Sequence, residues 1–589
     1  MRHDEILGLL HFLATPADSG LLRPLLLWEI TLWITALLAA AFLWRLRPGW
    51  VFRTEEMLRR MGSHRAACAW TIGGSVLVLR AMLLPLIPLP VPVVLDEFSY
   101  LLGADTFASG RIANPKHPMW LFFESININV RPTYQSMYPP AQAAVLAVGE
   151  KLLHSPWAGV LLSVALMCGL ICWMLQGWLP PQWALLGGIY AVLRFGIFSY
   201  WINSYWGGAV AACGGALLLG SLARLRSKPC AAQALVFALG LIVLANSRPF
   251  EGFLFALPCC AALLWTLARS PLGLRLSARM LLPATLLLAV AATWMLYYNW
   301  RGTGHALLMP YSLNQATYHI TRPFFFQKPY PIPHFNNPQL RSFFMLHEYP
   351  LLLRSRTRWG IEELMEQKLA CYYAFLLWPL LLLFIPALLL AFRERKLRVV
   401  AAAVLLMTAG LMAQLWPAHG HYAAPAVAAI FLLQLNALRE LRAQGTERAL
   451  WLSRAIVLVV FLWMLSPICE RLWNPYGFDD PAMASVPKEI DRARIEAQLS
   501  RTPGQHLVLV HYREHDVPSK EWVYNRADID HATVVWARDM GDEANQPLLR
   551  YFAGRKVWYV DHSAAPVLLP YSTVLALNDP ARTKLAPSR

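Results

Sequence analysis

Two adjacent carboxylates, Asp96 and Glu97, follow a long apolar segment and open a polar stretch that covers residues 91–141. The stretch is rich in Trp, Phe and Tyr and closes on a Tyr-Pro-Pro sequence that begins at Tyr138. A carboxylate can accept the proton of an attacking hydroxyl group, and flat rings can stack on sugar faces and lie among lipid headgroups. These residue types therefore indicate the first outer loop of a membrane enzyme, with the chemistry that sugar transfer from a lipid carrier needs.

The acidic pair also has a plainer interpretation. Asp96 could simply cap a short interfacial helix whose first turn is Leu95-Asp96-Glu97. An inverting transfer from a lipid phosphate needs one base and does not need an acid, because phosphate is already a good leaving group, so one carboxylate suffices. The second could hold a divalent cation, hold the acceptor or stay hydrated.

The composition predicts a membrane protein. The chain has 589 residues, of which 57% are hydrophobic and 15% charged, and its mean hydropathy is +0.41. A soluble protein of this length would not bury so much apolar surface. The net charge of +17 comes from short basic clusters between apolar segments, without a basic face or nucleic-acid motif. The clusters therefore indicate membrane topology and exclude a nucleic-acid partner. The nine cysteines show no metal-site spacing and no disulfide framework.

The apolar segments also predict which side faces the cytoplasm. A span needs about 20 residues, and roughly twelve candidate spans are present, among them residues 183–201 and 369–392. The first covers residues 25–44 and is followed by a strongly basic loop, and the second covers residues 67–88 and leads to Asp96. If the basic loop is cytoplasmic, the Asp96 loop is outside. Every strongly basic short loop then falls on one side and every long aromatic loop on the other. We therefore expect a bacterial inner-membrane protein whose active site and C-terminal domain lie on the outer, periplasmic side.

Three regions follow from these patterns. Residues 1–66 form an added N-terminal span with its basic loop, and residues 67–468 form a membrane core with outer loops at 91–156 and 300–368. Residues 469–589 are more charged and predict a small outer α/β domain. Its expected elements are strands at 506–511, 533–536 and 556–560 and a short helix at 546–552. Its histidines and Asp516 have no standard ligand spacing, so we expect surface histidines: His511, His515, His531 and His562.

With these residues in place, the chain resembles the GT-C glycosyltransferases, of the protein mannosyltransferase and lipid A aminoarabinose transferase kind. The resemblance covers roughly residues 67–438 and depends on the order of motifs placed on the outer face. The added first span departs from the family pattern, and the C-terminal tail lies outside the family core. The motifs are the acidic pair, the Tyr138-Pro139-Pro140 start of a half-helix, the Arg248-Pro249 turn, and the turn from His421-Tyr422 to Pro425.

The resemblance implies a polyprenyl-phosphate-linked sugar as donor, an inverting transfer on the outer membrane face, and an acidic base in the first outer loop. The acceptor of the expected enzyme is a lipid, a glycan or a protein. That base maps to Asp96, with Glu97 beside it. The departing phosphate needs positive charge and N–H donors. Of the candidates, we favour His421 from the resemblance and Arg301 from its place just past a span. Residues expected at the substrate, if they do not simply contact headgroups, are Lys116, Arg131, Tyr138, Arg248, Arg301, His419, His421 and Tyr422.

Other charged residues have structural explanations. Arg248 could pair with Glu251 across the interhelical turn. Asp105 and Glu124 are expected to be solvated or paired with Arg111, Lys116 or Arg131. Charges inside apolar runs are costly unless they are paired, reach the interface or lie beside water. Reaching the interface could explain Glu29 and Arg80, whereas Arg194 lies deeper and indicates a site, a buried pair or a misplaced span boundary.

Two segments of the second outer loop have more than one interpretation. In the second outer loop, residues 311–315 and 323–326 could line an acceptor groove, although an interfacial aromatic belt is the plainer explanation.

A transporter or lipid-carrier flippase is the alternative function and would predict paired repeats with broken helices and mid-membrane charges. No clear repeat is present, and most polar residues lie toward one face. A receptor anchored by its spans would not need two elaborate outer loops.

Overall fold

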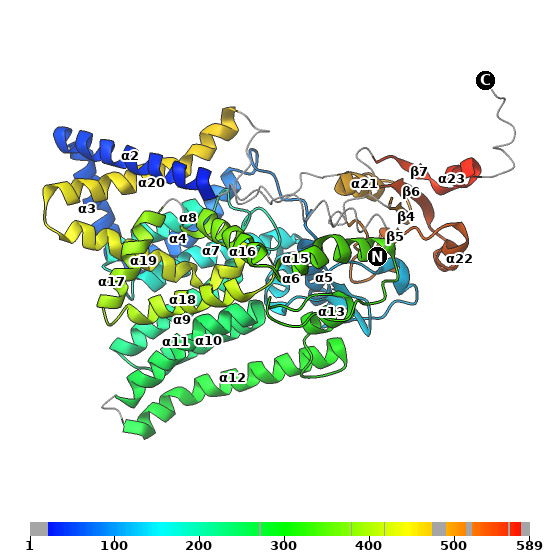
Figure 1. Cartoon of the computed structure of the whole chain (residues 1–589), viewed down its shortest axis with the longest axis horizontal. Helices are drawn as coiled ribbons and strands as arrows, with labels where there is room; N and C mark the ends of the chain where they lie inside the picture. Colours follow the sequence, from blue (N-terminus) through cyan, green and yellow to red (C-terminus); the bar gives the residue numbers. More distant parts are fainter. Residues whose placement is uncertain are drawn as a thin grey trace.

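The computed structural model describes residues 22–269, 273–377, 380–416, 419–473, 491–513, 521–562 and 566–578. A helix bundle forms one end of the molecule, and a small mixed sheet lies at the other end (Figure 1). Within the described residues, seven helices are long and apolar enough to span a membrane, and three further apolar helices are shorter. The predicted class, an α-helical polytopic membrane protein with a small C-terminal α/β domain, is confirmed.

The bundle helices begin and end at sequence signals that the chain supplies locally. Proline occupies the first helical position of α7, α8 and α11, where its missing N–H is harmless. The helices of the bundle are α2 (Leu22–Leu46), α3 (Gly49–Ser63), α4 (Arg65–Met82), α7 (Pro156–Leu175), α8 (Pro181–Phe195), α9 (Ala209–Ser227), α10 (Ala231–Ser247), α11 (Pro249–Ala268), α12 (Gly273–Thr303), α17 (Leu381–Arg393), α18 (Arg398–Ala413), η4 (Gly420–Ala426), α19 (Val427–Ala443) and α20 (Glu447–Trp473).

Two predicted spans differ from the helices observed. The span expected at 183–201 ends as a helix at Phe195, because Gly196 caps α8 and turns follow. The span expected at 369–392 is not one continuous helix. It begins in α16 (Arg358–Tyr372), continues in the π-helical segment η3 (Tyr373–Leu377) and ends in α17. An apolar run in the sequence therefore overstates helix length where a turn is buried among neighbouring helices. The number of twelve spans stays a prediction.

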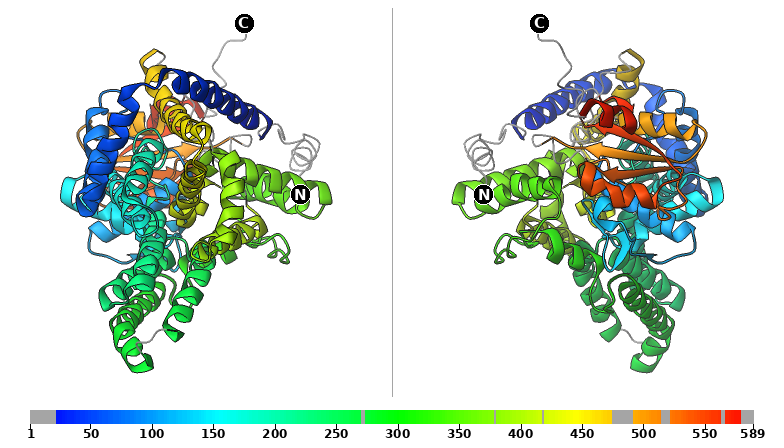
Figure 2. Two further views of the ribbon diagram at one scale, coloured as in Figure 1. Left: turned by 90° about the vertical axis from the view of Figure 1, so that its left-hand side faces the viewer. Right: turned by 90° about the vertical axis from the view of Figure 1, so that its right-hand side faces the viewer.

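The added N-terminal helix packs on the last helix of the bundle. α2 runs beside α20 (Figures 1 and 2), and an ion pair of 2.8 Å joins Arg47 after α2 to Glu447 at the start of α20. α3 lies at the end of the bundle remote from the C-terminal sheet (Figure 1). The predicted extra span is therefore a helix held by contacts with a segment about 400 residues later.

The charges inside apolar helices are bonded within the protein. Arg80 does not reach water as expected: its side chain is fully buried and donates to Pro88 O (3.2 Å) and Asn203 Oδ1 (3.1 Å). Arg194 donates through Nη2 to Phe375 O at 2.6 Å. Glu29, which is also buried, accepts a hydrogen bond from Trp33 Nε1 at 3.2 Å. These hydrogen bonds join neighbouring segments. Arg194 lies in the last turn of α8, one residue before the helix ends, so the span boundary expected at residue 201 was misplaced around it.

The first outer loop contains a helix, a small antiparallel sheet and a half-buried helix. Strand β3 lies at the centre of the sheet and pairs with both β1 and β2. The predicted half-helix begins at Pro140 and packs on α7, where Gly149 and Gly159 let the two backbones approach closely. The elements are α5 (Leu95–Ala108), β1 (Asn114–Pro115), η1 (Trp120–Phe123), β2 (Ile128–Asn129), β3 (Thr133–Ser136) and α6 (Pro140–Leu153).

The second outer loop packs on the first. The Asn129 side chain joins the two loops, because Nδ2 donates to Pro310 O (2.9 Å) and Oδ1 accepts from Asn314 Nδ2 (3.0 Å). The elements of this loop are α13 (Pro310–Tyr318), α14 (Pro338–Phe343), η2 (Phe344–Glu348), α15 (Tyr349–Arg354) and α16 (Arg358–Tyr372).

In its described residues the C-terminal domain forms a four-stranded sheet with three short helices. The strand order is β5-β4-β6-β7, in which β4 is parallel to β5 and β6 while β7 is antiparallel to β6. The predicted strands and helix are confirmed with shifts of a few residues at their ends. The domain lies over outer-loop segments (Figure 2, right). Its elements are α21 (Asp491–Ser500), β4 (His506–His511), β5 (Val534–Arg538), α22 (Asp542–Tyr551), β6 (Lys556–Asp561), β7 (Leu568–Pro570) and α23 (Tyr571–Asn578).

Candidate active site

Glu97 fastens the start of α5 to the bundle. Prolines before α5 keep the chain extended, and the helix then begins with Glu97 as its third residue. Its Oε2 atom accepts hydrogen bonds from the N–H groups of Val93 (2.8 Å) and Val94 (2.9 Å). Its Oε1 atom accepts from the N–H of Tyr205 (2.9 Å), which lies between α8 and α9. The buried carboxylate is thus occupied by three backbone donors.

Asp96, one residue earlier, is the less constrained carboxylate. Its side chain keeps partial exposure, and its Oδ1 atom accepts a hydrogen bond from Asn127 Nδ2 at 3.1 Å. Burial raises the pKa of Asp96 to about 7; the positive charge of Arg248 opposes this shift, and the negative charge of Glu97 adds to it. A carboxylate with this pKa can accept a proton near neutral pH.

Arg248 supplies positive charge beside Asp96. It lies between α10 and α11, where its guanidinium carbon is 4.6 Å from the centre of the Tyr422 ring. Glu251, on the first turn of α11, is buried and accepts a hydrogen bond from Gln414 Nε2 at 3.1 Å. The guanidinium stays partly exposed, as does the Tyr422 ring. Arg248 is therefore accessible to a ligand anion.

The two predicted histidines lie together behind Tyr422. The rings of His419 and His421 are parallel, with centroids 5.6 Å apart, and each lies against Trp206. The Tyr200 hydroxyl accepts from the backbone N–H of His421 (3.0 Å) and lies 2.8 Å from its Nδ1 atom. When the hydroxyl donates to Nδ1, the neutral His421 ring carries its proton on Nε2 and has Nε2–H as its donor. Burial and the charge of Arg248 lower the pKa of His419 to about 4.

Aromatic rings complete the cluster. Tyr138 stacks on Tyr100 with centroids 4.5 Å apart and planes at 21°, and Tyr100 lies one helical turn after Asp96. Tyr311, in α13, is partly exposed and interacts electrostatically with Glu251, Arg248 and Asp96. We define the site cluster as Asp96, Tyr100, Tyr138, Arg248, Tyr311, His419, His421 and Tyr422.

Three predicted cations do not join the site cluster. Lys116 and Arg131 are exposed and lie 5.4 Å and 4.1 Å from the centre of the Trp120 ring. Arg301 is exposed on the last turn of α12. Among the described residues, no hydrogen bond, ion pair or ring contact joins any of the three to Asp96 or Arg248. The cluster instead contains Tyr100, and Tyr200 lies next to it at His421. Of these two tyrosines only Tyr100 had a signal in the sequence, its spacing of four from Asp96.

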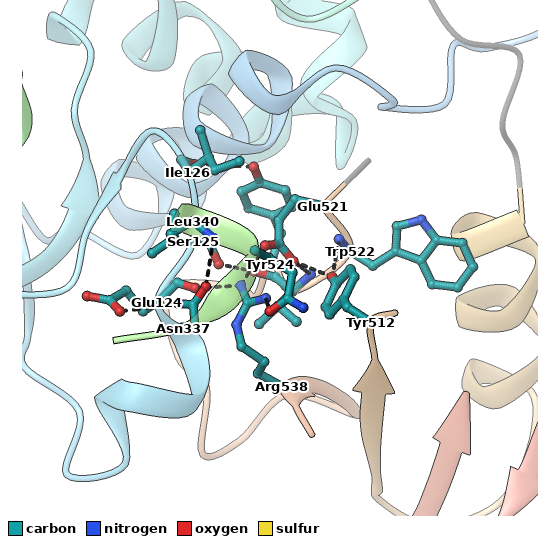
Figure 3. A network of polar contacts seen from close by, with 12 residues as sticks. Glu124, Ser125, Ile126, Asn337, Leu340, Tyr512, Glu521, Trp522, Tyr524 and Arg538 are labelled. Atoms are coloured by element: carbon teal, nitrogen blue, oxygen red, sulfur yellow. Dashed lines mark hydrogen bonds and ion pairs between the residues drawn. The ribbon is translucent and has the colours of Figure 1, made fainter. Parts of the chain in front are cut away.

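Glu124 corrects another expectation, because it is neither solvated nor paired with a cation of its loop. It is fully buried and accepts hydrogen bonds from Tyr318 Oη (2.9 Å) and Asn336 Nδ2 (3.1 Å) of the second outer loop. Its carbonyl oxygen accepts from Arg538 Nη2 (2.8 Å), and Arg538 in turn pairs with Glu521 at 2.5 Å (Figure 3). Glu124 therefore joins both outer loops and the C-terminal domain.

Asp105 and the described tail histidines also have defined partners. Asp105 Oδ2 accepts from the backbone N–H of Ala527 at 2.7 Å. His511 Nδ1 lies 2.8 Å from Asp539, and His531 lies 3.0 Å from Asp528. His562 is buried rather than on the surface as expected, and its ring lies against Tyr512 and Trp522. His515 and Asp516 lie outside the described residues.

The donor set at the acidic pair does not fit a divalent cation. Both oxygens of Glu97 already accept backbone hydrogen bonds, so Asp96 alone would have to supply carboxylate oxygens, and Arg248 lies close enough to repel a cation. Ca²⁺ takes six to eight oxygen ligands, and Mg²⁺ bound through one or two carboxylates takes its other ligands from waters and substrate phosphates, so Asp96 alone is a poor cation site without a bound phosphate. The described part of the chain also contains no group of three or more His, Cys, Asp or Glu side chains that could hold a metal ion.

The sequence matches no protein-family model and no curated protein. Among solved structures, the chain is similar to ArnT from Cupriavidus metallidurans in the apo state, with a TM-score of 0.44, 16% identity and coverage of 86% of this chain and 94% of that chain. The same values hold for ArnT bound to undecaprenyl phosphate. The apo oligosaccharyltransferase from Archaeoglobus fulgidus gives a TM-score of 0.41, 11% identity and coverage of 85% and 69%. At these values the similarity assigns no role to any residue of this chain.

Proposed function

We propose that the chain is an integral membrane glycosyltransferase that moves a sugar from a polyprenyl-phosphate donor to an acceptor hydroxyl, with inversion and with Asp96 as general base. The observation that carries the proposal is the placement of a partly exposed carboxyl group with a pKa of about 7 beside an accessible guanidinium and a set of tyrosine rings. A base, an anion-stabilising cation and stacking surfaces are what this reaction needs.

In the proposed step the acceptor oxygen attacks the anomeric carbon of the donor sugar. The acceptor proton passes to Asp96, and the bond between the anomeric carbon and the phosphate oxygen breaks. Polyprenyl phosphate leaves with the electron pair of that bond, and Arg248 offsets the charge that develops on it. The neutral histidines supply N–H donors without adding a second positive charge. A single displacement of this kind inverts the anomeric centre.

The route into α5 suits a donor with a lipid tail. The chain that leads from α4 to α5 exposes apolar side chains: Leu86 is 48%, Leu89 51% and Val91 38% exposed. Such residues are compatible with hydrocarbon at the membrane boundary. A prenyl chain could therefore lie against this segment while its phosphate reaches Arg248.

The basic residues support an active site on the outer face. Contacts bring several basic loops together at the end remote from the C-terminal sheet: Arg47 pairs with Glu447, Arg442 pairs with Glu55, and Arg226 donates to Lys396 O. An excess of Arg and Lys marks the cytoplasmic side of a membrane protein. The site cluster and the C-terminal domain would then face the periplasm.

Substitution of the base tests the proposal. We expect Asp96→Asn to lower transfer by about 10² or more, because positioned general-base catalysis contributes about 10² to 10⁴ in rate. A deletion strain complemented with wild type or variant is compared by mass spectrometry of its lipid-linked sugars, which accumulate when transfer fails. Asp528→Asn removes an exposed carboxylate and serves as control. Wild-type product levels from Asp96→Asn at equal expression would refute the assignment.

A further inference from the structure

A cavity lies at the end of the bundle opposite to Asp96. Its volume is about 460 Å³, and it lies between α2, α3, α8 and α20. Binding sites for small ligands commonly measure 300–1,000 Å³. The walls combine apolar side chains such as Leu58 and Phe461 with charged groups from α3, α19 and α20. Nothing in the proposed transfer reaction uses this cavity.

Arg454 is the most buried charged group of this cavity, with 9% of its surface exposed. Its guanidinium carbon lies 4.5 Å from the ring centres of both Phe52 and Trp451. Its Nε and Nη2 atoms donate to the two carboxylate oxygens of Glu55 at 2.9 Å and 2.8 Å. Its Nη1 atom is buried and donates no hydrogen bond to any residue that the structure describes.

The charges that line the cavity leave one positive charge uncompensated. Arg442 also binds Glu55, with donor distances of 2.7 Å and 3.1 Å, so two guanidinium groups share one carboxylate. Burial alone would raise the pKa of Glu55, but the hydrogen bonds from Arg454 and Arg442 lower it to about 2, so it stays ionised. Glu56 binds Arg59 and also Arg60, so it offers no negative charge to Arg442 or Arg454.

An orphaned N–H donor on a buried cation is costly unless an acceptor reaches it. Nη1 itself has no accessible surface, but an anion with a single negative charge that binds in the cavity at Arg442 would balance the positive charge that the two guanidinium groups leave over. The setting indicates a lipid rather than a soluble ion. α2 exposes Leu37 (55%) and Leu38 (67%), and at the cavity Trp50 (51%) and Phe52 (46%) are exposed aromatic residues of the kind found at lipid headgroups.

We propose that this cavity binds the phosphodiester headgroup of a membrane phospholipid, with the phosphate facing the part-exposed Arg442 guanidinium beside Arg454 and the acyl chains lying along α2 and α20. The bound lipid would hold the added elements α2 and α3 against the bundle. The site does not depend on the function proposed for Asp96, because it lies at the other end of the molecule.

Lipid retention by the purified full-length protein tests the proposal. The delipidated protein is incubated with phosphatidylglycerol, with diacylglycerol of the same chains, or with inorganic phosphate, and is followed by native mass spectrometry and thermal unfolding. We expect wild type to retain phosphatidylglycerol and to unfold at a higher temperature with it, and neither other probe to do so. Arg454→Gln should retain at least tenfold less. Arg53→Gln, which removes an exposed guanidinium of α3 outside the cavity, should behave as wild type.

A second variant covers the case in which Arg454→Gln does not fold. Val457→Phe fills the cavity from α20 and leaves the contacts of Arg454 with Glu55 in place, and it should also lose retention. Equal retention by wild type and both variants would overturn the proposal. Equal stabilisation by inorganic phosphate would overturn the lipid assignment and identify a soluble anion site. Equal binding of diacylglycerol would show that the acyl chains alone bind.

Discussion

At the residue scale, Asp96 and Glu97 have the same charge and opposite surroundings. Three backbone N–H groups surround the oxygens of Glu97, whereas a single amide from Asn127 reaches Asp96. A carboxylate saturated with donors is a poor proton acceptor, because protonation would break those bonds. The acidic pair thus divides into a positioning residue and a candidate base. The plainer interpretation of the pair holds in part, since Glu97 rather than Asp96 accepts from the helix cap.

The pH dependence of transfer should report Asp96. Its pKa of about 7 means that the carboxylate is largely protonated below pH 7 and cannot accept a proton there. Transfer should rise with pH, reach half its maximum near pH 7 and level off above it. The rate is measured on membranes with the lipid-linked sugar that accumulates in the deletion strain. A flat profile between about pH 5 and pH 9 would be incompatible with this base.

Arg248 should influence both the rate and the pH profile. Its charge lowers the pKa of Asp96 against the effect of burial, so Arg248→Gln should move the half-maximum to higher pH. It should also lower the maximum rate by about 10² to 10³, the usual cost of losing one group that stabilises transition-state charge. Arg358→Gln, at an exposed guanidinium of the second outer loop, is the control. A lower rate with an unchanged profile would separate Arg248 from Asp96.

The site could be predicted from the sequence where each motif follows the end of a span. Asp96, Arg248 and His421 each lie beyond an apolar segment on the same predicted face, so the topology brings them together. Glu124 could not be placed in this way, because its partners Tyr318 and Asn336 lie in another loop. No local spacing indicates which distant side chains will meet.

At the element scale, the start of α5 determines where Asp96 lies. Glu97 holds that start to Tyr205, beyond α8, and so fixes the helix against the bundle. We expect Glu97→Gln to lower the free energy of unfolding by about 2 kcal/mol, because hydrogen bonds to charged groups contribute about 1.5–3 kcal/mol each. Thermal unfolding in detergent measures the change. Asp96→Asn is the matched comparison and should not lower stability, because it replaces a carboxylate whose charged form burial disfavours. Equal stability of the two variants would refute the positioning role.

Elements with long periodic patterns or proline starts were predictable, and very short ones were not. The half-helix was expected at 139–153 and begins at Pro140. Strands β1 and β2 of the first outer loop have two residues each. Such strands are too short to show an alternating pattern, and they form because the loop is packed between the second loop and the C-terminal domain.

At the scale of the whole molecule, the C-terminal domain and the first outer loop share one hydrophobic core. Phe98 of α5 stacks on Tyr524 with centroids 4.4 Å apart and planes at 2°. The Tyr524 hydroxyl donates to Ile126 O (3.2 Å), 398 residues earlier in the chain. The sequence indicated that the tail is a separate fold, but it carried no signal for these contacts because they depend on distant residues. The tail therefore supports the element that carries Asp96.

Loss of the contact between Tyr524 and Phe98 should lower activity at the site cluster. We expect Tyr524→Ala to cost about 3 kcal/mol, as for other buried aromatic truncations, and to lower transfer although Tyr524 is not in the site cluster. Hydrogen exchange should rise in α5 and in residues 114–136. Val567→Ala, at a residue 62% exposed on the same domain, is the control. Increased exchange confined to the C-terminal domain would show that the loop holds its shape without it.

Because α5 presents Glu97 to the bundle and Phe98 to the C-terminal domain, the tail is not an interchangeable module. A chimera that grafts a foreign tail onto this core would need to import the first outer loop along with it. Exchanging residues 469–589 alone should leave the C-terminal domain poorly packed on the first outer loop. Exchanging them together with residues 91–156 would preserve the native contacts between the two.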